Sequence, residues 1–272
     1  MTPSSGEPPL PAPLRPPAEP GAEPAARRAV SARLPFQPVR ATYVFLGLIV
    51  IVFLGQLASM QLTGTDQLIQ FGAKDNIAIA NGEYWRLLTA VFLHASVLHI
   101  AFNGYALYIL GRDVESFAGW LRFTVIFLLA GLSGSVTSLI FNPSPSVGAS
   151  GAIFGLIGAL VIFLYRHRKL FGERGRRNLQ SIIVIALINL AIGLSGGIDN
   201  WAHLGGLAGG LVLGWFLGPV WTLSLDPMLG GQAVVQDQRP MGAAQWALVL
   251  AFAIVLAGLT FLGATLAAAA NH

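Results

Sequence analysis

Hydrophobic residues in this chain fall into long runs that are separated by shorter polar segments. Seven runs stand out, and they cover residues 43–60, 97–110, 120–141, 150–165, 179–195, 201–220 and 246–267. A helix needs about 20 residues to cross about 30 Å of hydrocarbon, so most runs suffice once their boundary residues are added. The pattern predicts an all-α, polytopic membrane protein with seven crossings, of which the second and fourth are short.

The segments between the runs divide the chain into four parts. Residues 1–40 hold 11 of the 16 prolines and no hydrophobic run, which predicts a disordered cytoplasmic tail without a cleavable signal peptide. We expect a compact core over 41–220, a cytoplasmic linker over 221–245, and a seventh helix with an outer C-terminus over 246–272. Within the core, residues 61–96 are too apolar for a free loop and should form short helices in the outer membrane interface.

The charge distribution supports a membrane location and predicts an orientation. Only 10% of the residues are charged, against about 25% in soluble domains. Fourteen of the 16 lysines and arginines lie on one side of the predicted membrane, with Lys74 and Arg86 on the other. The positive-inside rule then places the N-terminus in the cytoplasm and the C-terminus outside the cell (inner) membrane. This topology accounts for the net charge of +4, and no basic surface interleaved with aromatic residues indicates nucleic-acid binding.

Several classes of chemistry are disfavoured by residues that the chain lacks. It has no cysteine and no H-E-x-x-H motif, so neither a thiolate nucleophile nor a zinc protease site is expected. No aspartate pair and no series of carboxylates or arginines lies within a run, which argues against an aspartyl mechanism and coupled transport. The G-x-S-x-G motif fails because Ala152 replaces its last glycine and no strand is predicted. We therefore expect neither a metal nor a cofactor, and serine combined with histidine remains.

A serine begins the fourth run, and a histidine lies near the start of the sixth. If the fourth run ends at Tyr165 it forms about 24 Å of helix, about 6 Å less than the hydrocarbon core. Ser150 is therefore expected below the outer surface, under a polar pit, and His203 at a similar depth. A histidine can take the proton of a serine hydroxyl near neutral pH. Small residues spaced by four let the two helices approach closely; they are Gly151 and Gly155 in the fourth run and Gly206, Gly210, Gly214 and Gly218 in the sixth.

Three further side chains fit around this pair. His99 and Asn103 are four residues apart in the second run and share one helical face near its outer end. Together with the backbone N–H of Ser150 at a helix N-terminus, they would supply hydrogen-bond donors to an oxyanion. Phe154, one turn after Ser150, can pack on the imidazole ring of His203.

Five motifs, in order along the chain, make it similar to a known family. They are EYWR with Glu83, Trp85 and Arg86, HxxxN with His99 and Asn103, GxxxE with Gly111 and Glu115, GASG over 148–151, and AHLGGLAGG over 202–210. With these motifs, residues 41–220 resemble the rhomboid intramembrane serine proteases. The form that the chain resembles has a six-helix core and one additional C-terminal transmembrane helix.

The resemblance implies a role for each motif. Ser150 would be the nucleophile and His203 the base of a two-residue catalytic centre, and His99 and Asn103 would line the oxyanion hole. Substrates would be membrane-spanning segments of other proteins, cut near the outer face. The family often has a tyrosine where this chain has Phe154, and stacking does not need the hydroxyl. Scaffold roles would fall to Glu83, Trp85, Arg86, Gly111, Glu115, Gly151, Gly155, Gly206 and Gly210.

Each candidate residue also has a purely structural interpretation. Ser150 could serve only as a helix N-cap, and His203 could be an interfacial histidine bonded to a carbonyl. His99 and Asn103 could be interhelical hydrogen-bond partners. His94 stays undecided between a structural and a catalytic role.

Asp199 raises one more alternative, because it lies four residues before His203. If the sixth helix started one turn earlier, the two side chains could pair and complete a Ser–His–Asp triad. The family that the chain resembles works with a dyad, which argues against this pairing.

Two other functions remain open. A catalytically silent rhomboid-like protein would bind transmembrane segments and govern their trafficking or stability, but such relatives typically lack the serine or the histidine. A small transporter is disfavoured, because no charges lie at mid-membrane and no paired broken helices mark two halves.

Overall fold

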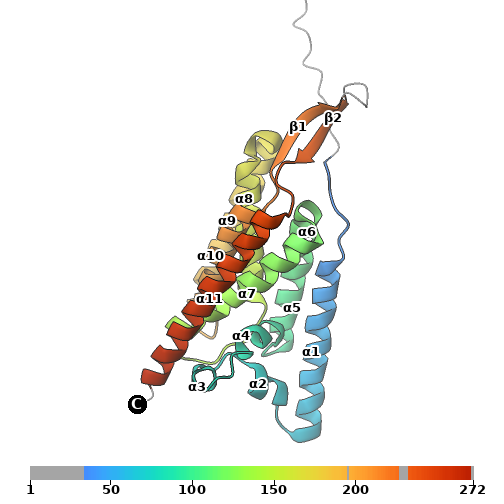
Figure 1. The fold of residues 1–272 in the computed structure, drawn as a ribbon. Coiled ribbons are helices and arrows are strands. Elements are labelled where there is room, and N and C mark those ends of the chain that lie inside the picture. Colours follow the sequence, from blue (N-terminus) through green and yellow to red (C-terminus); the bar gives the residue numbers. More distant parts are fainter. Residues whose placement is uncertain (1–33, 195, 227–231, 271–272) are drawn as a thin grey trace, which may run out of the picture.

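The computed structural model describes residues 34–194, 196–226 and 232–270. Every hydrophobic run forms a helix (Figure 1). Most of the predicted tail lies outside the described residues, as do residue 195 of the fifth run, the middle of the linker and the last two residues. The main helices are α1 (Ala41–Thr63), α5 (Val97–Ala106) with η2 (Leu107–Gly111) and α6 (Arg112–Ala118), α7 (Trp120–Phe141), α8 (Ser150–Arg166), α9 (Arg168–Gly193), α10 (Asn200–Leu217) and α11 (Ala243–Ala269).

Three helices in the described part of the chain are long and hydrophobic enough to cross a membrane alone, namely α1, α7 and α11. The helix of the second run forms, with the short helices before it, a pair bent by 89° that passes the same test as one broken span. Helix α8 has 17 residues, about 26 Å, and is short as expected. The all-α fold is confirmed, whereas the full number of crossings stays a prediction.

The segment between α1 and α5 folds into short helices, as predicted. They are α2 (Gln67–Gly72), α3 (Asn76–Ala80), α4 (Arg86–Thr89) and η1 (Ala90–Phe92), and they lie together at one end of the bundle (Figure 1). We call this end the outer end, following the orientation predicted from charge. The C-terminal end of α11 also lies there, whereas the start of α1 lies at the opposite, inner end.

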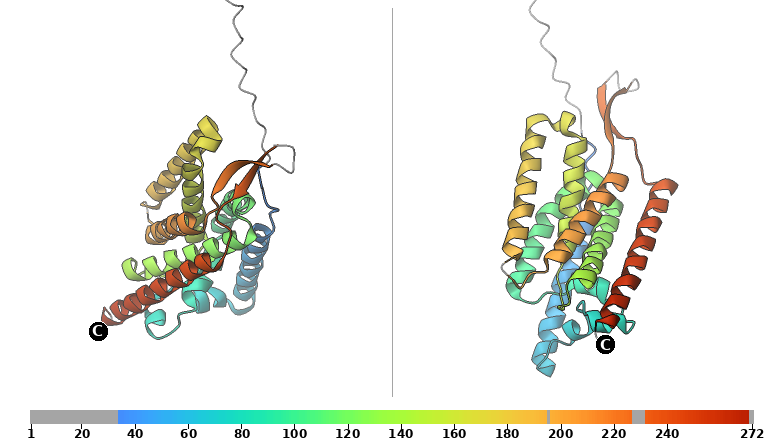
Figure 2. Two further views of the ribbon diagram at one scale, coloured as in Figure 1. Left: turned by 45° about the horizontal axis from the view of Figure 1, so that its top comes forward. Right: turned by 90° about the vertical axis from the view of Figure 1, so that its left-hand side faces the viewer.

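Helices α7, α8 and α10 pack through their glycines and form the centre of the molecule. A Cβ atom added to Gly206 would overlap the carbonyl of Gly151, and one added to Gly210 would overlap the carbonyl of Gly155. The close approach of backbones predicted from the glycine spacing is therefore confirmed. Helices α9 and α11 pack on opposite sides of this group (Figure 2).

Two of the expected scaffold motifs make contacts that tie distant segments together. Arg86 forms an ion pair with Glu83 at 2.6 Å and donates to the carbonyls of Gln70 and Ala73, while Trp85 stacks on Phe71. These contacts hold α2 and α4 against each other at the outer end.

Glu115 connects α6 to the start of α1. Its carboxylate is completely buried and accepts from the backbone N–H groups of Arg40, Ala41 and Thr42 and from the Thr42 hydroxyl, at 2.7–2.8 Å. A carboxylate at a helix N-terminus satisfies N–H groups that have no partner within the helix. Gly111 faces Thr42 so closely that an added Cβ would lie 2.8 Å from its methyl group.

The predicted linker 221–245 contains an antiparallel hairpin, so the expectation that the chain has no strands was wrong. Strands β1 (Trp221–Asp226) and β2 (Gln232–Asp237) pair with Trp221 opposite Asp237. Trp221 is buried beside Phe163 and His167, and Arg122 forms an ion pair with Asp237 at 2.8 Å. These contacts fix the hairpin to the inner end of the bundle (Figure 1).

Candidate active site

Ser150 and His203 come together at the outer ends of α8 and α10. The Ser150 Oγ atom lies 2.9 Å from His203 Nε2, although the two residues are 53 positions apart. The helices that carry them are held at backbone contact by the glycines described above. The contact predicted from the sequence is therefore present.

Ser150 does not act as the N-cap of α8. The N-cap is Ala149, which makes no capping hydrogen bond through its side chain, and Ser150 is the first helical residue. Its hydroxyl is therefore free to bond with the imidazole instead of a backbone N–H. The purely structural interpretation of this serine is not supported by the geometry.

The imidazole of His203 is held by stacking. The ring of Phe154 lies parallel to it, with 4.4 Å between the centroids and 11° between the planes, as expected from the sequence. For Nε2 to accept from the serine hydroxyl, the ring proton must reside on Nδ1, which is buried and has no hydrogen-bond partner among the described residues.

The alternative triad is absent, because Asp199 is engaged elsewhere. It is the N-cap of α10, where its Oδ1 accepts from the backbone N–H of Ala202 at 3.1 Å. Its Oδ2 accepts a hydrogen bond from the Ser138 hydroxyl on α7. Helix α10 begins at Asn200, so the carboxylate caps the helix and does not reach the His203 ring.

His99 and Asn103 face the same region from α5. The His99 ring lies against Gly148, where an added Cβ would be only 2.7 Å from its Cε1 and Nε2 atoms, and Gly148 has a φ of +130°. The Asn103 amide is buried and donates to the His99 carbonyl at 3.1 Å. Both side chains therefore border the backbone that leads into Ser150, and Gly148 is required for that approach.

A cavity of about 930 Å³ joins these groups. Its polar lining includes Ser150, His203, His99, Asn103 and Asp199, and its apolar lining comes from α5, α8 and α9. The irregular segment that precedes α8 forms one wall. Backbone without regular hydrogen bonding is tolerated at membrane depth only inside protein or beside a hydrated cavity, which fits the polar pit that we expected.

His94 lies beside His99 and is held through its backbone. Its N–H donates to Gln56 Oε1 at 3.0 Å, and its carbonyl accepts from Gln56 Nε2 at 2.9 Å. Its ring packs edge-on against His99 with 5.1 Å between centroids. These contacts fit a structural role, which remains a prediction.

Sequence reasoning missed the polar groups in and around the segment before α8. They include Lys74, whose side chain is completely buried, together with Asn142, Ser144 and Ser146. A lysine in an apolar outer segment was the available signal, since a buried ammonium needs several acceptors.

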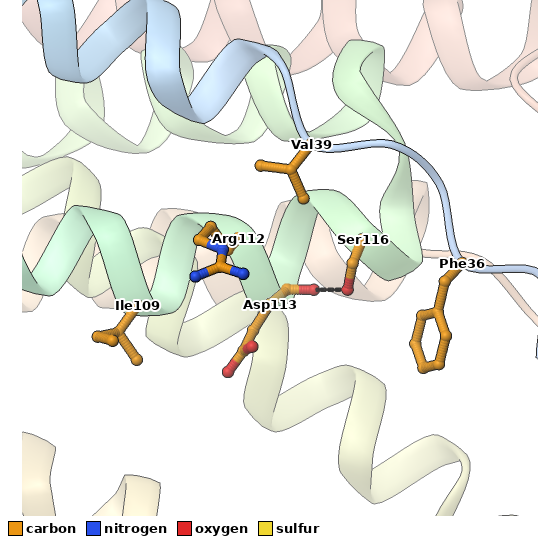
Figure 3. A pocket seen from close by; sticks show the side chains of 6 residues that line it. All are labelled: Phe36, Val39, Ile109, Arg112, Asp113 and Ser116. Carbon is orange, nitrogen blue, oxygen red and sulfur yellow. Dashed lines mark hydrogen bonds between the residues drawn. The ribbon is translucent and has the colours of Figure 1, made fainter.

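A second hollow, of about 380 Å³, is lined by residues that precede α1 and by residues of η2 and α6 (Figure 3). Arg112 and Asp113 border it, and the Ser116 hydroxyl donates to the Asp113 carbonyl at 2.7 Å. It contains no serine–histidine pair. Within the described residues, no group of three or more metal-ligating side chains is found at either end.

Comparison with known proteins identifies a domain that contains most of these residues. The sequence model of the Rhomboid domain matches residues 81–220, which include all the residues discussed at the cavity except Lys74 and Gln56. Rhomboid protease GluP from Bacillus subtilis (strain 168) is 46% identical over 178 residues, which are 65% of this chain and 34% of that protein.

Two relatives from Arabidopsis thaliana match a similar region. RHOMBOID-like protein 6, mitochondrial, is 38% identical over 187 residues, covering 68% of this chain and 55% of the relative. RHOMBOID-like protein 1 is 39% identical over 148 residues, which are 54% of this chain and 38% of that relative. The chain thus spans between about a third and just over half of the length of these relatives. From the domain match and these identities, the chain belongs to the rhomboid family.

Proposed function

We propose that this membrane protein is an intramembrane serine endopeptidase, which hydrolyses peptide bonds in or near the transmembrane segments of other membrane proteins. The observation that carries the proposal is the 2.9 Å separation between Ser150 Oγ and His203 Nε2 beside a large cavity. The similarity to a relative named as a rhomboid protease supports the same reaction.

In the first half of the reaction, Ser150 Oγ attacks the carbonyl carbon of the substrate peptide bond. The hydroxyl proton moves to His203 Nε2 as the new C–O bond forms. When the tetrahedral intermediate collapses, the C–N bond breaks and His203 returns the proton to the leaving amine. The products of this step are a free amino end and an acyl ester on Ser150.

In the second half, a water molecule from the cavity attacks the ester carbonyl and gives its proton to His203. The C–O bond to Ser150 then breaks, and the serine recovers that proton. The carboxyl end of the cut substrate is released, and both residues return to their starting protonation states.

The oxyanion of each intermediate needs donors that already face it. We assign this task to the side chains of His99 and Asn103 and to the backbone N–H of Ser150. The Ser150 N–H lies in the first turn of α8, where the helix dipole favours negative charge. The two side chains also border the cavity.

His203 works in this proposal without a carboxylate partner. The positive charge that it gains in the transition state faces the Phe154 ring, which can stabilise a cation through its π face. The same stacking restricts the imidazole to the orientation in which Nε2 points at the serine. A dyad is therefore sufficient here.

We also propose a division of the chain into domains and a membrane location. Residues 41–220 form the catalytic core, and α11 is an added helix packed on α7. The protein resides in the cell (inner) membrane with its N-terminus in the cytoplasm and its C-terminus outside, which the distribution of basic residues supports. Its substrates would be single-span proteins that are cut near the outer face.

A serine-directed fluorophosphonate tests the proposal. The native protein should become labelled, and the Ser150→Ala variant should not. Proteomics of cells that carry either form should then reveal outer domains shed only by the native protein. Equal labelling of the two forms, or shedding that survives the substitution, would contradict the proposal.

A further inference from the structure

Lys74 is the most unusual side chain near the proposed active site that the mechanism does not use. It lies between α2 and α3 with 0% exposure, and its Nζ donates to Asn142 O at 2.8 Å and Ser144 O at 2.7 Å. A third bond goes to Asn76 Oδ1 at 3.0 Å. Three donors thus meet three acceptors, which a buried ammonium requires.

Two of these acceptors belong to the segment 142–148, which connects α7 to the proposed nucleophile. The same segment pairs with Lys74 through its backbone, because Lys74 N donates to Ser146 O and Ser146 N donates to Lys74 O, both at 3.0 Å. Further along, Gly148 N donates to Ala90 O at 2.9 Å. The outer segment therefore holds the whole stretch that leads into Ser150.

Asp199 lines the cavity together with the same segment. Its carboxylate accepts a hydrogen bond from the Ser138 hydroxyl and lines the same cavity as Asn142 and Ser146. Asp199 also caps α10, one turn before His203. The segment 142–148 is thus bonded to a buried cation and shares the cavity with a carboxylate that caps the helix carrying the proposed base.

We propose that Lys74 is a positioning residue for the reaction, which acts by fixing segment 142–148 and thereby the backbone that precedes Ser150. This inference rests on the proposed function. The segment forms one wall of the cavity, and its Gly148 sets the distance to the His99 ring. Release of the segment would move the backbone N–H of Ser150 and the groups that face it, without removing any group that touches the substrate.

The test compares Lys74→Met with a matched control, Thr89→Val. Both changes remove hydrogen bonds of the outer segment, but the Thr89 hydroxyl bonds to Gly72 O and Trp85 O and has no bond to segment 142–148. Fluorophosphonate is the probe, and its maximal labelling rate and half-saturating concentration are measured separately. We expect Lys74→Met to lower the maximal rate by about tenfold or more, since small misplacements of reacting groups have large effects on rate. The half-saturating concentration should change less than about twofold, as should both values for Thr89→Val.

A pH profile separates positioning from a general loss of stability. Burial lowers the pKa of Lys74 to about 8, although the carboxylates of Asp199 and Asp75 raise it. Above that pH the neutral amine keeps only two donors for three acceptors. The native protein should therefore label more slowly as the pH rises through about 8, and Lys74→Met should lack this step.

Hydrogen exchange gives a readout that does not depend on catalysis. The amide protons of Ser146 and Gly148 should exchange faster in Lys74→Met, while those within α7 and α8 stay protected. If Lys74→Met does not fold, Lys74→Gln retains two donors and should show a smaller change in the same direction. Labelling and exchange equal to those of Thr89→Val would overturn the inference.

The outcomes also distinguish the two proposals. If the native protein and Ser150→Ala label equally, the proposed function fails. Amide exchange then still tests whether Lys74 holds segment 142–148 in place. If the native protein labels and Lys74→Met labels at the same rate and with the same pH profile, only the positioning role fails.

Discussion

Two buried histidines, one at each end of the bundle, differ in the hydrogen bonds that their rings make. His167 at the inner end has both ring nitrogens bonded to backbone, since Nδ1 donates to Phe163 O at 2.8 Å and Nε2 accepts from Trp221 N at 2.8 Å. His203 at the outer end bonds to a hydroxyl through Nε2, and its Nδ1 has no partner among the described residues. Both are less than 7% exposed.

The difference lies in what a proton transfer would disturb. A proton added to His167 Nε2 would displace a backbone hydrogen bond and loosen the hairpin. In the proposed reaction, a proton added to His203 Nε2 would come from the hydroxyl that is already bonded to it, and the cavity alongside would admit the substrate. Burial alone therefore does not identify a reactive histidine; the nature of its hydrogen-bond partners does.

Removing the outer histidine should have the largest effect on the cleavage rate. We expect His203→Ala to lower it by about a thousandfold or more, because the serine then lacks a base. The thermal unfolding temperature should change little, since the ring makes one hydrogen bond and one stacking contact. Cleavage of a membrane-anchored reporter, measured on purified protein in lipid vesicles, checks this, and a residual rate near the native one would show that another base serves Ser150.

Asp199→Asn should have an intermediate effect. Asparagine can still cap α10 and accept a hydrogen bond, but it loses the charge opposite Lys74. We expect a decrease of about two- to tenfold in the same vesicle assay, since one weakened hydrogen-bond network is involved. A decrease of several orders of magnitude would restore the triad that the geometry disfavours.

His167→Ala should have the smallest effect on the cleavage rate and instead reduce stability. We expect a rate per folded molecule within about twofold of native and a loss of about 1–3 kcal/mol in the free energy of unfolding, because two buried hydrogen bonds disappear. Denaturant unfolding followed by tryptophan fluorescence measures this loss.

The pH dependence of stability provides a further test of the structural role of His167. Burial lowers the pKa of His167 below its ordinary value, and Arg166 lowers it further, while the bond to Phe163 O and the charge of Asp237 raise it. The unfolded chain therefore takes up a proton at higher pH than the folded protein does. Stability should fall as the pH drops below about 6.5, and His167→Ala should lack this part of the acid sensitivity.

The helices and the Ser150–His203 contact were predictable because local patterns determine them. Each hydrophobic run is long enough to form a helix by itself, and the glycine spacing on two runs indicated which helices touch. Helix depth placed the serine and the histidine at the same level. Phe154 followed from helical periodicity, since it lies one turn after Ser150.

The hairpin and the contacts of Lys74 were missed for different reasons. In the hairpin, Thr222 and Ser224 alternate with apolar residues, a period-two signal too short to stand out beside long helices. Lys74 meets Asn142 and Ser144 about 70 residues away, through loops whose course no periodicity predicts. Glu115 is a similar case, because its N-terminal partners on α1 are more than 70 residues earlier in the chain.

The contact between Gly206 and the Gly151 carbonyl has a consequence for how the protein responds to its surroundings. No side chain separates the two main chains there, so no rotamer change can adjust the gap between them. Under heating, thinning of the bilayer or binding of a bulky lipid, the backbone contact between the two helices can therefore only persist or break completely. Loss of activity under such stress should therefore be abrupt, with no gradual decline before the helices separate.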